Sequence, residues 1–386
     1  MRDRDVLAYL AYLQPRLDLF LADLSTLSLM DCGTDNKAGV DDVGRVMRAK
    51  LERLSMDVEA HDGGVRGDTL VARRRGRGNA RLLLIGHLDT VYPAGWPGEH
   101  SFHIEGDIAR GPGTCDMKAG VLVGLYALDA LYAAGFDRFA EIAFVLNGDE
   151  EVSSPVSTSV IEREARGRDA VLVLEAAREN GDIVSARKGF ARFDIRVRGR
   201  AAHAGVEPEK GRSALLELAH QIVALHALNG TTPGATINIG VAAGGMRRNI
   251  VPDEASAEID VRARDAEGMD GIIAALRAQL GRVSVPNTAI SVDGGVVRPP
   301  MEKTDATARL VEWCQEAARD LGFAVRDAAT GGGSDANNTA ALGVPTIDGL
   351  GPIGGLDHSP REYIKISSIV PRTAMVAGLI ERVCHG

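Results

Sequence analysis

Three continuous apolar runs, each ending in a polar side chain, constrain the fold of this chain most strongly. They are RLLLIGHLD at 81–89, EIAFVLNGDEE at 141–151 and DAVLVLEAA at 169–177. Apolar runs without polar alternation are typical of strands buried on both faces, and the helical pattern at 117–135, closed by Gly135, lies between the first two. The sequence therefore predicts an α/β domain with a mixed, mainly parallel sheet flanked by helices.

The pattern changes near residue 189. FARFDIRVRGRAA at 190–202 alternates apolar and polar residues, and further alternating strands and two helical patterns follow it. Alternation predicts an antiparallel sheet with one face in solvent, so this part of the chain is expected to be an α+β unit. The buried-helix pattern returns at 304–322 and again at 366–383.

A chain of 386 residues exceeds the usual size of one hydrophobic core, so two domains are expected. The change of pattern places one discontinuous domain at 1–188 and 300–386. It places an inserted domain at 189–299.

Composition excludes several classes of protein. The net charge is −9, with a pI near 5.6, which argues against a nucleic-acid-binding face. The four cysteines are scattered without a CxxC pair, which favours reduced thiols. The amphipathic N-terminus lacks a signal peptide pattern, and no stretch is apolar enough to span a membrane. We therefore expect a cytoplasmic protein.

Residues of metal-ligand type stand at the boundaries of predicted elements. They are His87, Asp116, Glu151, Glu175 and His358. Two histidines and three carboxylates do not suit one structural zinc site, which takes four ligands and favours thiolates, but they suit two sites if one carboxylate bridges. Open α/β sheets carry their sites at the carboxyl ends of strands, and metal pairs about 3.5–4 Å apart activate water in hydrolases. A hydrolase is thus the primary hypothesis.

Taken singly, these positions have plainer interpretations. Asp89, two residues after His87, could orient the imidazole or could cap a turn. Asp116 opens a helix and would serve as its N-cap. Glu150 and Glu151 place like charges at a buried strand end, where one could bind metal while the other accepts a proton from metal-bound water. The acidic cluster could instead be a solvated loop.

The chain resembles the zinc-dependent aminoacylase, succinyl-diaminopimelate desuccinylase and carboxypeptidase G family of metallopeptidases. The resemblance runs from about residue 40 to the last helix. The motifs that carry it are, in chain order, GHLDTVYP, GPGTCDMKAG, NGDEEVSS, LEAA, AAHAGVEPEKGRSA, RRNIVP, DVRARD, TGGGSDAN and GLDHSP. The family fold is a zinc catalytic domain interrupted by a dimerisation, or lid, domain. The resemblance therefore implies that 189–299 is this lid/dimerisation domain and that the protein is a homodimer.

The resemblance also implies the metal ligands. His87 and Glu175 would bind one Zn²⁺, Glu151 and His358 the other, and Asp116 would bridge them. Two Zn²⁺ per subunit are expected, although Co²⁺ or Mn²⁺ could occupy the same nitrogen and oxygen ligands.

Three further residues receive catalytic roles from the resemblance. Glu150 would be the general base, and Asp89 the carboxylate that orients His87. His203, in AAHAG, would reach the active site of the partner subunit and polarise the scissile carbonyl. From the sequence alone, the preferred interpretation of His203 is a turn residue ahead of the helix expected at 211–228.

The substrate contacts implied by the resemblance come from the inserted domain and a late glycine loop. Asn249 in RRNIVP and Arg262 in DVRARD match positions that touch substrate. Arg298 matches a position that holds a carboxylate, which suits its bidentate guanidinium, although it could be a surface charge. Gly332 and Gly333 match a loop that offers backbone amides to a substrate carboxylate.

The chain departs from the family pattern at two places. Glutamate-cleaving members carry a lysine shortly after the ligand glutamate, whereas here AARENGDIVSARKG is one residue shorter and offers Arg187 and Lys188 later. After Glu151 the usual glycine-rich helix start is replaced by VSSPVSTS.

The expected function is hydrolysis of an amide bond beside a free carboxylate, in a dipeptide-like or N-acyl amino acid substrate. Release of a C-terminal amino acid such as glutamate is one form of this reaction. The alternatives are a biosynthetic deacylase of the acetylornithine or succinyl-diaminopimelate type, and a non-catalytic binding protein on the same fold. A nucleotide-binding enzyme is disfavoured because no GxGxxG follows the first strand. We expect a small-molecule substrate and no nucleic-acid or membrane partner.

Overall fold

The computed structural model describes residues 6–385. The chain forms two compact units. Unit 1 comprises Met1–Ser185, Lys303–Ala329 and Ser334–Gly386, and unit 2 comprises Ala186–Glu302 with Thr330–Gly333. Unit 2 is thus inserted into unit 1 in the sequence, and a short glycine loop near residue 331 returns to it.

Unit 1 is built on a six-stranded sheet. Its strands in chain order are β1 (Asp57–His61), β2 (Gly67–Arg75), β3 (Ala80–His87), β6 (Phe139–Gly148), β7 (Ala170–Val173) and β14 (Thr346–Ile347). The spatial order is β1-β2-β6-β3-β7-β14. Strands β6, β3, β7 and β14 run parallel to one another, and the hairpin β1-β2 joins β6 antiparallel. This confirms the predicted mixed, mainly parallel sheet.

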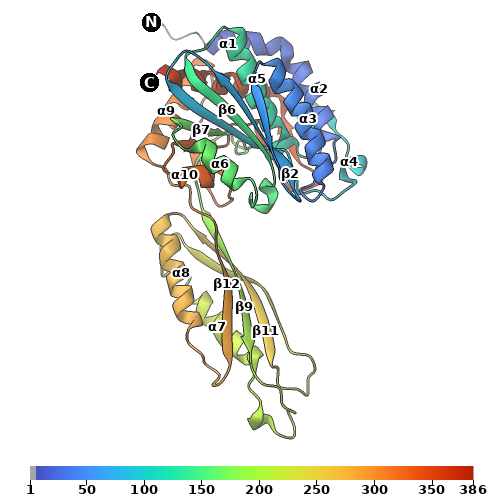
Figure 1. Ribbon diagram of the computed structural model, residues 1–386, viewed down its shortest axis with the longest axis vertical. Coiled ribbons are helices and arrows are strands. Elements are labelled where there is room, and N and C mark those ends of the chain that lie inside the picture. Colours follow the sequence, from blue (N-terminus) through green and yellow to red (C-terminus); the bar gives the residue numbers. More distant parts are fainter. Residues whose placement is uncertain (1–5, 386) are drawn as a thin grey trace. The chain divides into compact units, whose positions relative to one another are not determined.

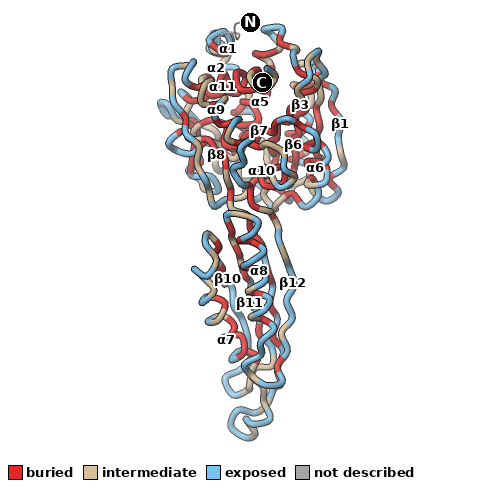
Figure 2. Tube along the Cα trace, turned by 90° about the vertical axis from the view of Figure 1, so that its left-hand side faces the viewer, coloured by how far each residue is buried: buried red, intermediate tan, exposed pale blue. Residues whose placement is uncertain are grey.

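The three apolar runs form the centre of this sheet. β3, β6 and β7 are buried along almost their whole length, as Figure 2 shows for the interior of unit 1. Parallel strands are joined by long crossover connections, which are usually helices, and these helices cover both faces of the sheet. Both faces of each strand are therefore apolar, and the sequence of these strands does not alternate between apolar and polar residues. The carboxyl ends of the three strands meet at one edge of the sheet.

Helices cover both faces of the unit 1 sheet (Figure 1). The helices of unit 1 are α1 (Val6–Leu13), α2 (Leu17–Ser28), α3 (Lys37–Arg53), α4 (Trp96–Glu99), α5 (Ala119–Ala133), α6 (Thr158–Ala165), α9 (Asp305–Asp320), α10 (Asp335–Ala340) and α11 (Ile366–His385). The helix predicted at 117–135 is α5, and Gly135 follows it with φ +68°. A β-carbon at Gly86 of β3 would lie 2.8 Å from Val121, so glycine allows α5 to pack closely on the sheet. None of the helices within residues 6–385 is both long and apolar enough to cross a membrane.

A second, four-stranded sheet in unit 1 is absent from the sequence prediction. It contains β4 (His103–Glu105), β5 (Ile108–Arg110), β15 (Gly354–Gly355) and β16 (Tyr363–Lys365). The pairing of β16 with β5 joins segments about 250 positions apart, with Tyr363 opposite Arg110. It therefore brings the loop that carries His358 beside the turn that leads to Asp116.

Unit 2 is an antiparallel sheet covered by helices. Its elements are β9 (Gly189–Arg198), α7 (Ala214–His226), β10 (Thr236–Gly244), β11 (Glu254–Ala263), α8 (Ala266–Leu280) and β12 (Ala289–Arg298). The strand order is β10-β11-β9-β12; Figure 1 labels β11, β9 and β12 side by side in this order. Alternate β9 residues such as Phe193 and Ile195 are buried with Leu218 of α7 and Ile272 of α8, while the intervening residues are exposed. The α+β fold of the insertion is therefore as predicted.

One predicted strand in unit 2 starts later than expected. The segment VSVPNTAISVDGG at 283–295 is one of the alternating strands expected after residue 190, but β12 begins only at Ala289. Pro286 and Asn287, the latter with φ +62°, belong to a turn before it. Two short strands, β8 (Ile183–Arg187) and β13 (Asp327–Thr330), pair with each other near the positions where the chain passes between the units.

Candidate metal centre

All five predicted ligands belong to unit 1 and gather at the carboxyl edge of its main sheet. His87 is the last residue of β3, Glu151 lies in a 3₁₀ turn just after β6, and Glu175 follows β7 by two residues. Asp116 lies in the turn Thr114–Lys118 that leads into α5, and His358 lies in the loop between β15 and β16. Parallel strands place their ends together, which explains how ligands distant in sequence become neighbours.

Asp116 stands between the two histidines. Its Oδ1 lies 2.9 Å from Nε2 of His87, and its Oδ2 lies 3.0 Å from Nε2 of His358. Glu175 Oε1 is 3.8 Å from Nε2 of His87, and Glu151 Oε2 is 3.4 Å from Nε2 of His358. The five side chains thus form two groups, each with one histidine and one glutamate, that share the Asp116 carboxylate.

The pKa values of Glu151, Glu175 and His358 are raised above their ordinary values. Burial raises the pKa of Glu151 to about 7, with the charge of Asp116 adding to the effect. Burial and then Asp116 likewise raise the pKa of Glu175 well above its ordinary value. Hydrogen bonds to Asp116 and Glu151 raise the pKa of His358 to about 11. The Asp116 charge therefore disfavours ionisation of both neighbouring glutamates. Burial opposes the ionisation of Asp116 itself, but hydrogen bonds from His358 and His87 hold the pKa of Asp116 below its ordinary value.

The donor set fits divalent cations. Nitrogen and carboxylate ligands lie about 2.0–2.2 Å from zinc, so ligand atoms near 3 Å apart are compatible with binding the same ion. The ligand atoms of His87, Asp116 and Glu151 all lie within 4.8 Å of one another. Glu151 Oε1 is buried and has no hydrogen-bond partner within residues 6–385. A cation would satisfy this oxygen and offset the excess negative charge.

Asp89 lies beside His87, as expected, and makes further contacts as well. Nδ1 of His87 lies 3.0 Å from the Asp89 carbonyl oxygen and 3.4 Å from its carboxylate Oδ1. The carboxylate accepts hydrogen bonds from the Thr34 hydroxyl at 2.8 Å and from the backbone amides of Glu150 and Glu151 at 3.2 and 3.3 Å. Asp89 therefore holds the backbone of the two glutamates as well as lying beside His87.

The segment VSSPVSTS after Glu151 forms a tight turn. Ser153 and Ser154 have φ values of +76° and +56°, which are uncommon for residues with a side chain. The Asp149 carboxylate stabilises the turn by accepting hydrogen bonds from the amides of Val156 and Ser157. Glycine is therefore not needed to bring the chain from β6 into α6.

His203 and Asn249 are neighbours in unit 2. The Ala204 amide donates to the Asn249 carbonyl at 3.0 Å, and His203 forms a β-bridge with Ile250. His203 is exposed, and its Nδ1 accepts from the Gly205 amide at 3.2 Å. The motifs AAHAG and RRNIVP are thus paired in space, although 46 positions separate the two residues.

The other predicted substrate residues also belong to unit 2 and meet at the glycine loop. Arg262 pairs bidentately with Asp260, at 2.7 and 3.1 Å, and donates to the Gly331 carbonyl at 3.1 Å. Arg298 is buried rather than a surface charge. A β-carbon at Gly333 would lie 3.1 Å from Cδ of Arg298, so glycine permits the loop to pack on this side chain. The Gly332 carbonyl accepts from Arg187 at 3.0 Å.

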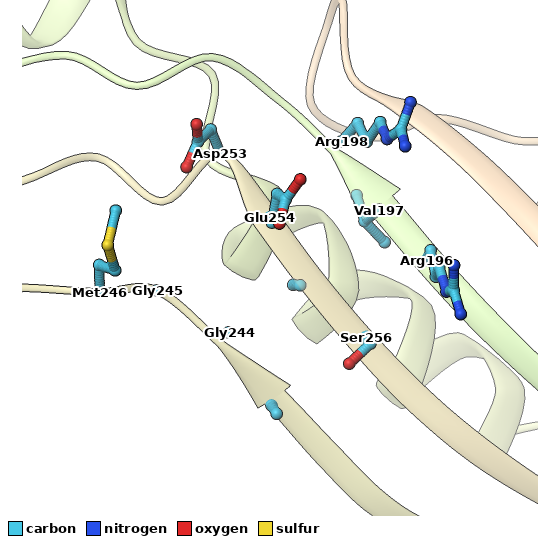
Figure 3. A pocket seen from close by; sticks show the side chains of 11 residues that line it. Arg196, Val197, Arg198, Gly244, Gly245, Met246, Asp253, Glu254 and Ser256 are labelled. Atoms are coloured by element: carbon cyan, nitrogen blue, oxygen red, sulfur yellow. The ribbon is translucent and has the colours of Figure 1, made fainter.

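A separate groove of about 510 Å³ lies on unit 2 (Figure 3). It is formed by the end of β9, the start of β11 and the turn after β10, and both basic and acidic side chains line it, including Arg196, Arg198 and Glu254. None of the predicted metal ligands lines this groove. Its turn continues through Met246 toward Asn249.

Three residues near the ligands were missed by sequence reasoning. Asp357 precedes His358 and can offer a carboxylate oxygen close to it and to Asp116. Tyr92 and Glu362 are buried and hydrogen-bonded to each other at 2.5 Å beside the Asp116 turn. Tyr92 lies within GHLDTVYP and Glu362 follows GLDHSP by two residues, but only the tertiary structure shows that these two side chains meet.

Unit 1 is an α/β unit that carries two histidines and three carboxylates at the carboxyl edge of its sheet, and an α+β unit interrupts it in the sequence. These features together define a class of metal-dependent hydrolases. The chain belongs to peptidase family M20/M25/M40, whose sequence profile matches residues 83–382. It is therefore an enzyme of the metallopeptidase and amidohydrolase type.

Individual relatives agree with this family. The chain is 33% identical over 365 residues to carboxypeptidase G2 of Pseudomonas sp. strain RS-16, covering 92% of this chain and 87% of the relative. It is 27% identical over 366 residues to acetylornithine deacetylase of Myxococcus xanthus, covering 88% and 91%. The crystal structure of aminopeptidase PepT from Bacillus cereus superposes with a TM-score of 0.81 at 25% identity, covering 95% and 98%.

Proposed function

We propose that this chain is a dinuclear zinc hydrolase that cleaves an amide bond next to a free carboxylate. The observation that carries the proposal is the position of Asp116, whose two oxygens contact the two histidines at 2.9 and 3.0 Å. A carboxylate held between two histidine–glutamate pairs is the arrangement required of a bridging ligand. His87 and Glu175 would hold one ion, and His358 and Glu151 the other.

A zinc pair held by these residues would polarise the scissile carbonyl of the substrate and lower the pKa of the attacking water. Glu150 accepts the proton of the attacking water and later gives it to the leaving amine. Its backbone amide donates to the Asp89 carboxylate at 3.2 Å, so the base is held on a supported turn. His203 from a second subunit donates to the oxygen on which negative charge develops. The inserted unit, 189–299, would thus form the homodimer that brings His203 to the site.

The substrate is a small molecule with a carboxylate beside the scissile amide, either a peptide with a free C-terminus or an N-acyl amino acid. Support comes from the 33% identity to carboxypeptidase G2 and from the cluster of Arg262, Arg298, Gly332 and Gly333 in unit 2. Guanidinium groups bind carboxylates bidentately. We expect the protein to act in the cytoplasm.

A biosynthetic deacylase is the second candidate. The observation that favours it is the absence of the lysine by which glutamate-cleaving members hold a side-chain carboxylate, together with the 27% identity to acetylornithine deacetylase. A substrate panel separates the two candidates. Hydrolysis of N-acyl glutamate and of peptides with C-terminal glutamate favours the carboxypeptidase, whereas preferential release of acetate from N-acetylornithine favours the deacylase.

The test of the whole proposal begins with metal content. Elemental analysis of protein purified without chelator should give two zinc ions per subunit. Absence of metal, combined with no hydrolysis of any panel substrate after zinc is added back, would instead support a non-catalytic binding protein.

A further inference from the structure

Glu362 is a buried carboxylate that accepts hydrogen bonds from the turn that carries Asp116 and from Tyr92. Only 2% of the residue is exposed. Its Oε1 accepts from the backbone amides of Cys115 at 2.7 Å and Asp116 at 2.9 Å. Its Oε2 accepts from the Gly113 amide at 2.9 Å and from the Tyr92 hydroxyl at 2.5 Å. Four donors therefore converge on one side chain.

A buried carboxylate is costly to keep unless its charge is compensated. Within residues 6–385, Glu362 forms no ion pair with a lysine, arginine or histidine, so amide dipoles and one hydroxyl provide the compensation. Three amides from one turn can point to the same carboxylate only if the backbone of that turn adopts one conformation. The hydrogen bonds that stabilise Glu362 therefore also fix the turn from Gly113 to Asp116.

This turn determines where the Asp116 carboxylate lies. Gly113 adopts φ +70°, and a β-carbon there would lie 2.8 Å from Thr90 Cγ2, so the turn packs closely on the segment after β3. The Asp116 amide is bonded to Glu362, while the Asp116 side chain reaches His87 and His358. A shift of the backbone at this residue would move both carboxylate oxygens together.

Tyr92 connects the segments that carry His87 and His358 to Glu362. It lies five residues after His87, and its hydroxyl is 3.1 Å from the Ser359 carbonyl as well as 2.5 Å from Glu362. Ser359 directly follows His358. The pair Tyr92–Glu362 thus joins the segments that carry His87, Asp116 and His358, three of the five predicted ligands.

We propose that Glu362, supported by Tyr92, is a positioning residue that holds Asp116 between His87 and His358 and so maintains both metal sites. The inference rests on the proposed function, because it assigns Glu362 a role toward the bridging carboxylate. Glu362 is not one of the proposed ligands, because both of its carboxylate oxygens already accept hydrogen bonds from the Asp116 turn and from Tyr92. Outer groups that orient metal ligands typically contribute about 10–100-fold in metal affinity.

The test compares metal binding with folding. Glu362→Gln keeps the volume of the side chain but replaces one acceptor oxygen with an NH₂ group, which cannot accept the hydrogen bonds now made by Oε2. Tyr92→Phe removes only the hydroxyl. Glu164→Gln is the matched control, because Glu164 of α6 is also a buried glutamate of unit 1 but pairs with Arg73 of β2 and with Arg168, which follows α6.

Metal-free wild type and variants would be titrated with Co²⁺, and binding followed by calorimetry and by the visible absorption of the bound ion. Thermal unfolding of each metal-free protein would be recorded in parallel. We expect Glu362→Gln to weaken Co²⁺ binding by about 10–100-fold and to alter the absorption spectrum. Tyr92→Phe should weaken binding less, and Glu164→Gln should lower thermal stability without changing Co²⁺ affinity.

Two outcomes distinguish the inference from the proposed function. A wild-type protein that binds no Co²⁺ would overturn the proposed function itself. A wild type that binds two ions, with Glu362→Gln binding both equally tightly and with the same spectrum, would overturn only the positioning role. If Glu362→Gln does not fold, Tyr92→Phe decides: weakened Co²⁺ binding supports the role, and unchanged binding overturns it.

Discussion

Replacement of Glu150 by glutamine tests the proposed general base most directly. Glutamine has the same shape, but its amide cannot accept a proton from water at neutral pH. The backbone of residue 150 holds the turn, and the substitution leaves it unchanged: the amide donates to the Asp89 carboxylate, and the carbonyl accepts from the Ser153 amide at 2.7 Å. The turn and the adjacent Glu151 should therefore be undisturbed.

The expected loss of rate follows from the role and from the surroundings. A positioned general base contributes about 10²–10⁴-fold, which equals roughly 2.7–5.4 kcal/mol of activation free energy at 1.36 kcal/mol for each factor of ten. The charge of Glu150 raises the pKa of Glu175, so its carboxylate lies close to the cluster. Because the side chains of Glu151 and Glu175 are only 6% and 14% exposed, bulk water is a poor substitute for the base, and we expect the upper half of this range.

The assay is steady-state hydrolysis of the best substrate from the panel, with metal content measured on the same preparation. Glu150→Gln should bind two zinc ions and keep a KM near that of the wild type, with kcat lowered. Glu162→Gln, a more exposed glutamate of α6 that pairs with Arg166, is the control and should leave kcat unchanged. A Glu150→Gln protein with full metal content and more than a tenth of the wild-type kcat would refute the assignment.

Three further outcomes are expected. Asp116→Asn replaces one bridging oxygen with an NH₂ group that cannot bind a cation, so elemental analysis should find fewer than two zinc ions per subunit; two tightly bound ions would contradict the bridge. His203→Ala should lower kcat by about 10²–10³-fold without loss of metal. If His203 acts across subunits, an equal mixture of His203→Ala and Glu150→Gln subunits should regain about a quarter of wild-type activity after subunit exchange. About half of the dimers would then be mixed, and each mixed dimer would contain one intact site of two. No recovery would exclude action in trans. Glu164→Gln should lower the free energy of unfolding at pH 7 by about 1–3 kcal/mol. Burial opposes ionisation of Glu164, but hydrogen bonds from Arg73 hold its pKa below the ordinary value. The contribution of Glu164 to the free energy of unfolding is therefore present above its unfolded-state pKa and is lost as pH falls through its folded-state pKa. Urea unfolding should show that the difference in free energy of unfolding between wild type and Glu164→Gln becomes smaller as pH falls. A difference that does not change with pH would contradict this.

The elements that the sequence predicted well are those in which local pattern and burial agree. β3, β6 and β7 are uninterrupted apolar runs, and a strand buried on both faces needs such a run wherever it lies in the sheet. β4, β5, β15 and β16 were missed because each has only two or three residues. Such short strands depend on partners distant in the chain rather than on local propensity.

The candidate site shows the same division. His87, Glu151 and Glu175 follow recognisable strands, so their position at one edge of the sheet could be inferred before the structure was known. The role of Asp89 is different: its carboxylate binds the amides of Glu150 and Glu151, some 60 residues away. The substrate residues and the lid/dimerisation role of 189–299 remain predictions from resemblance, because metal, substrate and a second subunit are needed to test them.

The sequence by itself determined the class of fold and the donor atoms of the candidate metal centre. Both depend on residue type and on periodicity, which are local properties of the chain. Only the tertiary structure decided that Asp116 lies between His87 and His358, and that Tyr92 and Glu362 hold its turn in place. The physical reason is that these contacts join residues up to 270 positions apart in the chain. No local sequence pattern predicts such contacts, because they depend on the pairing of β16 with β5 and on the packing of the buried strands.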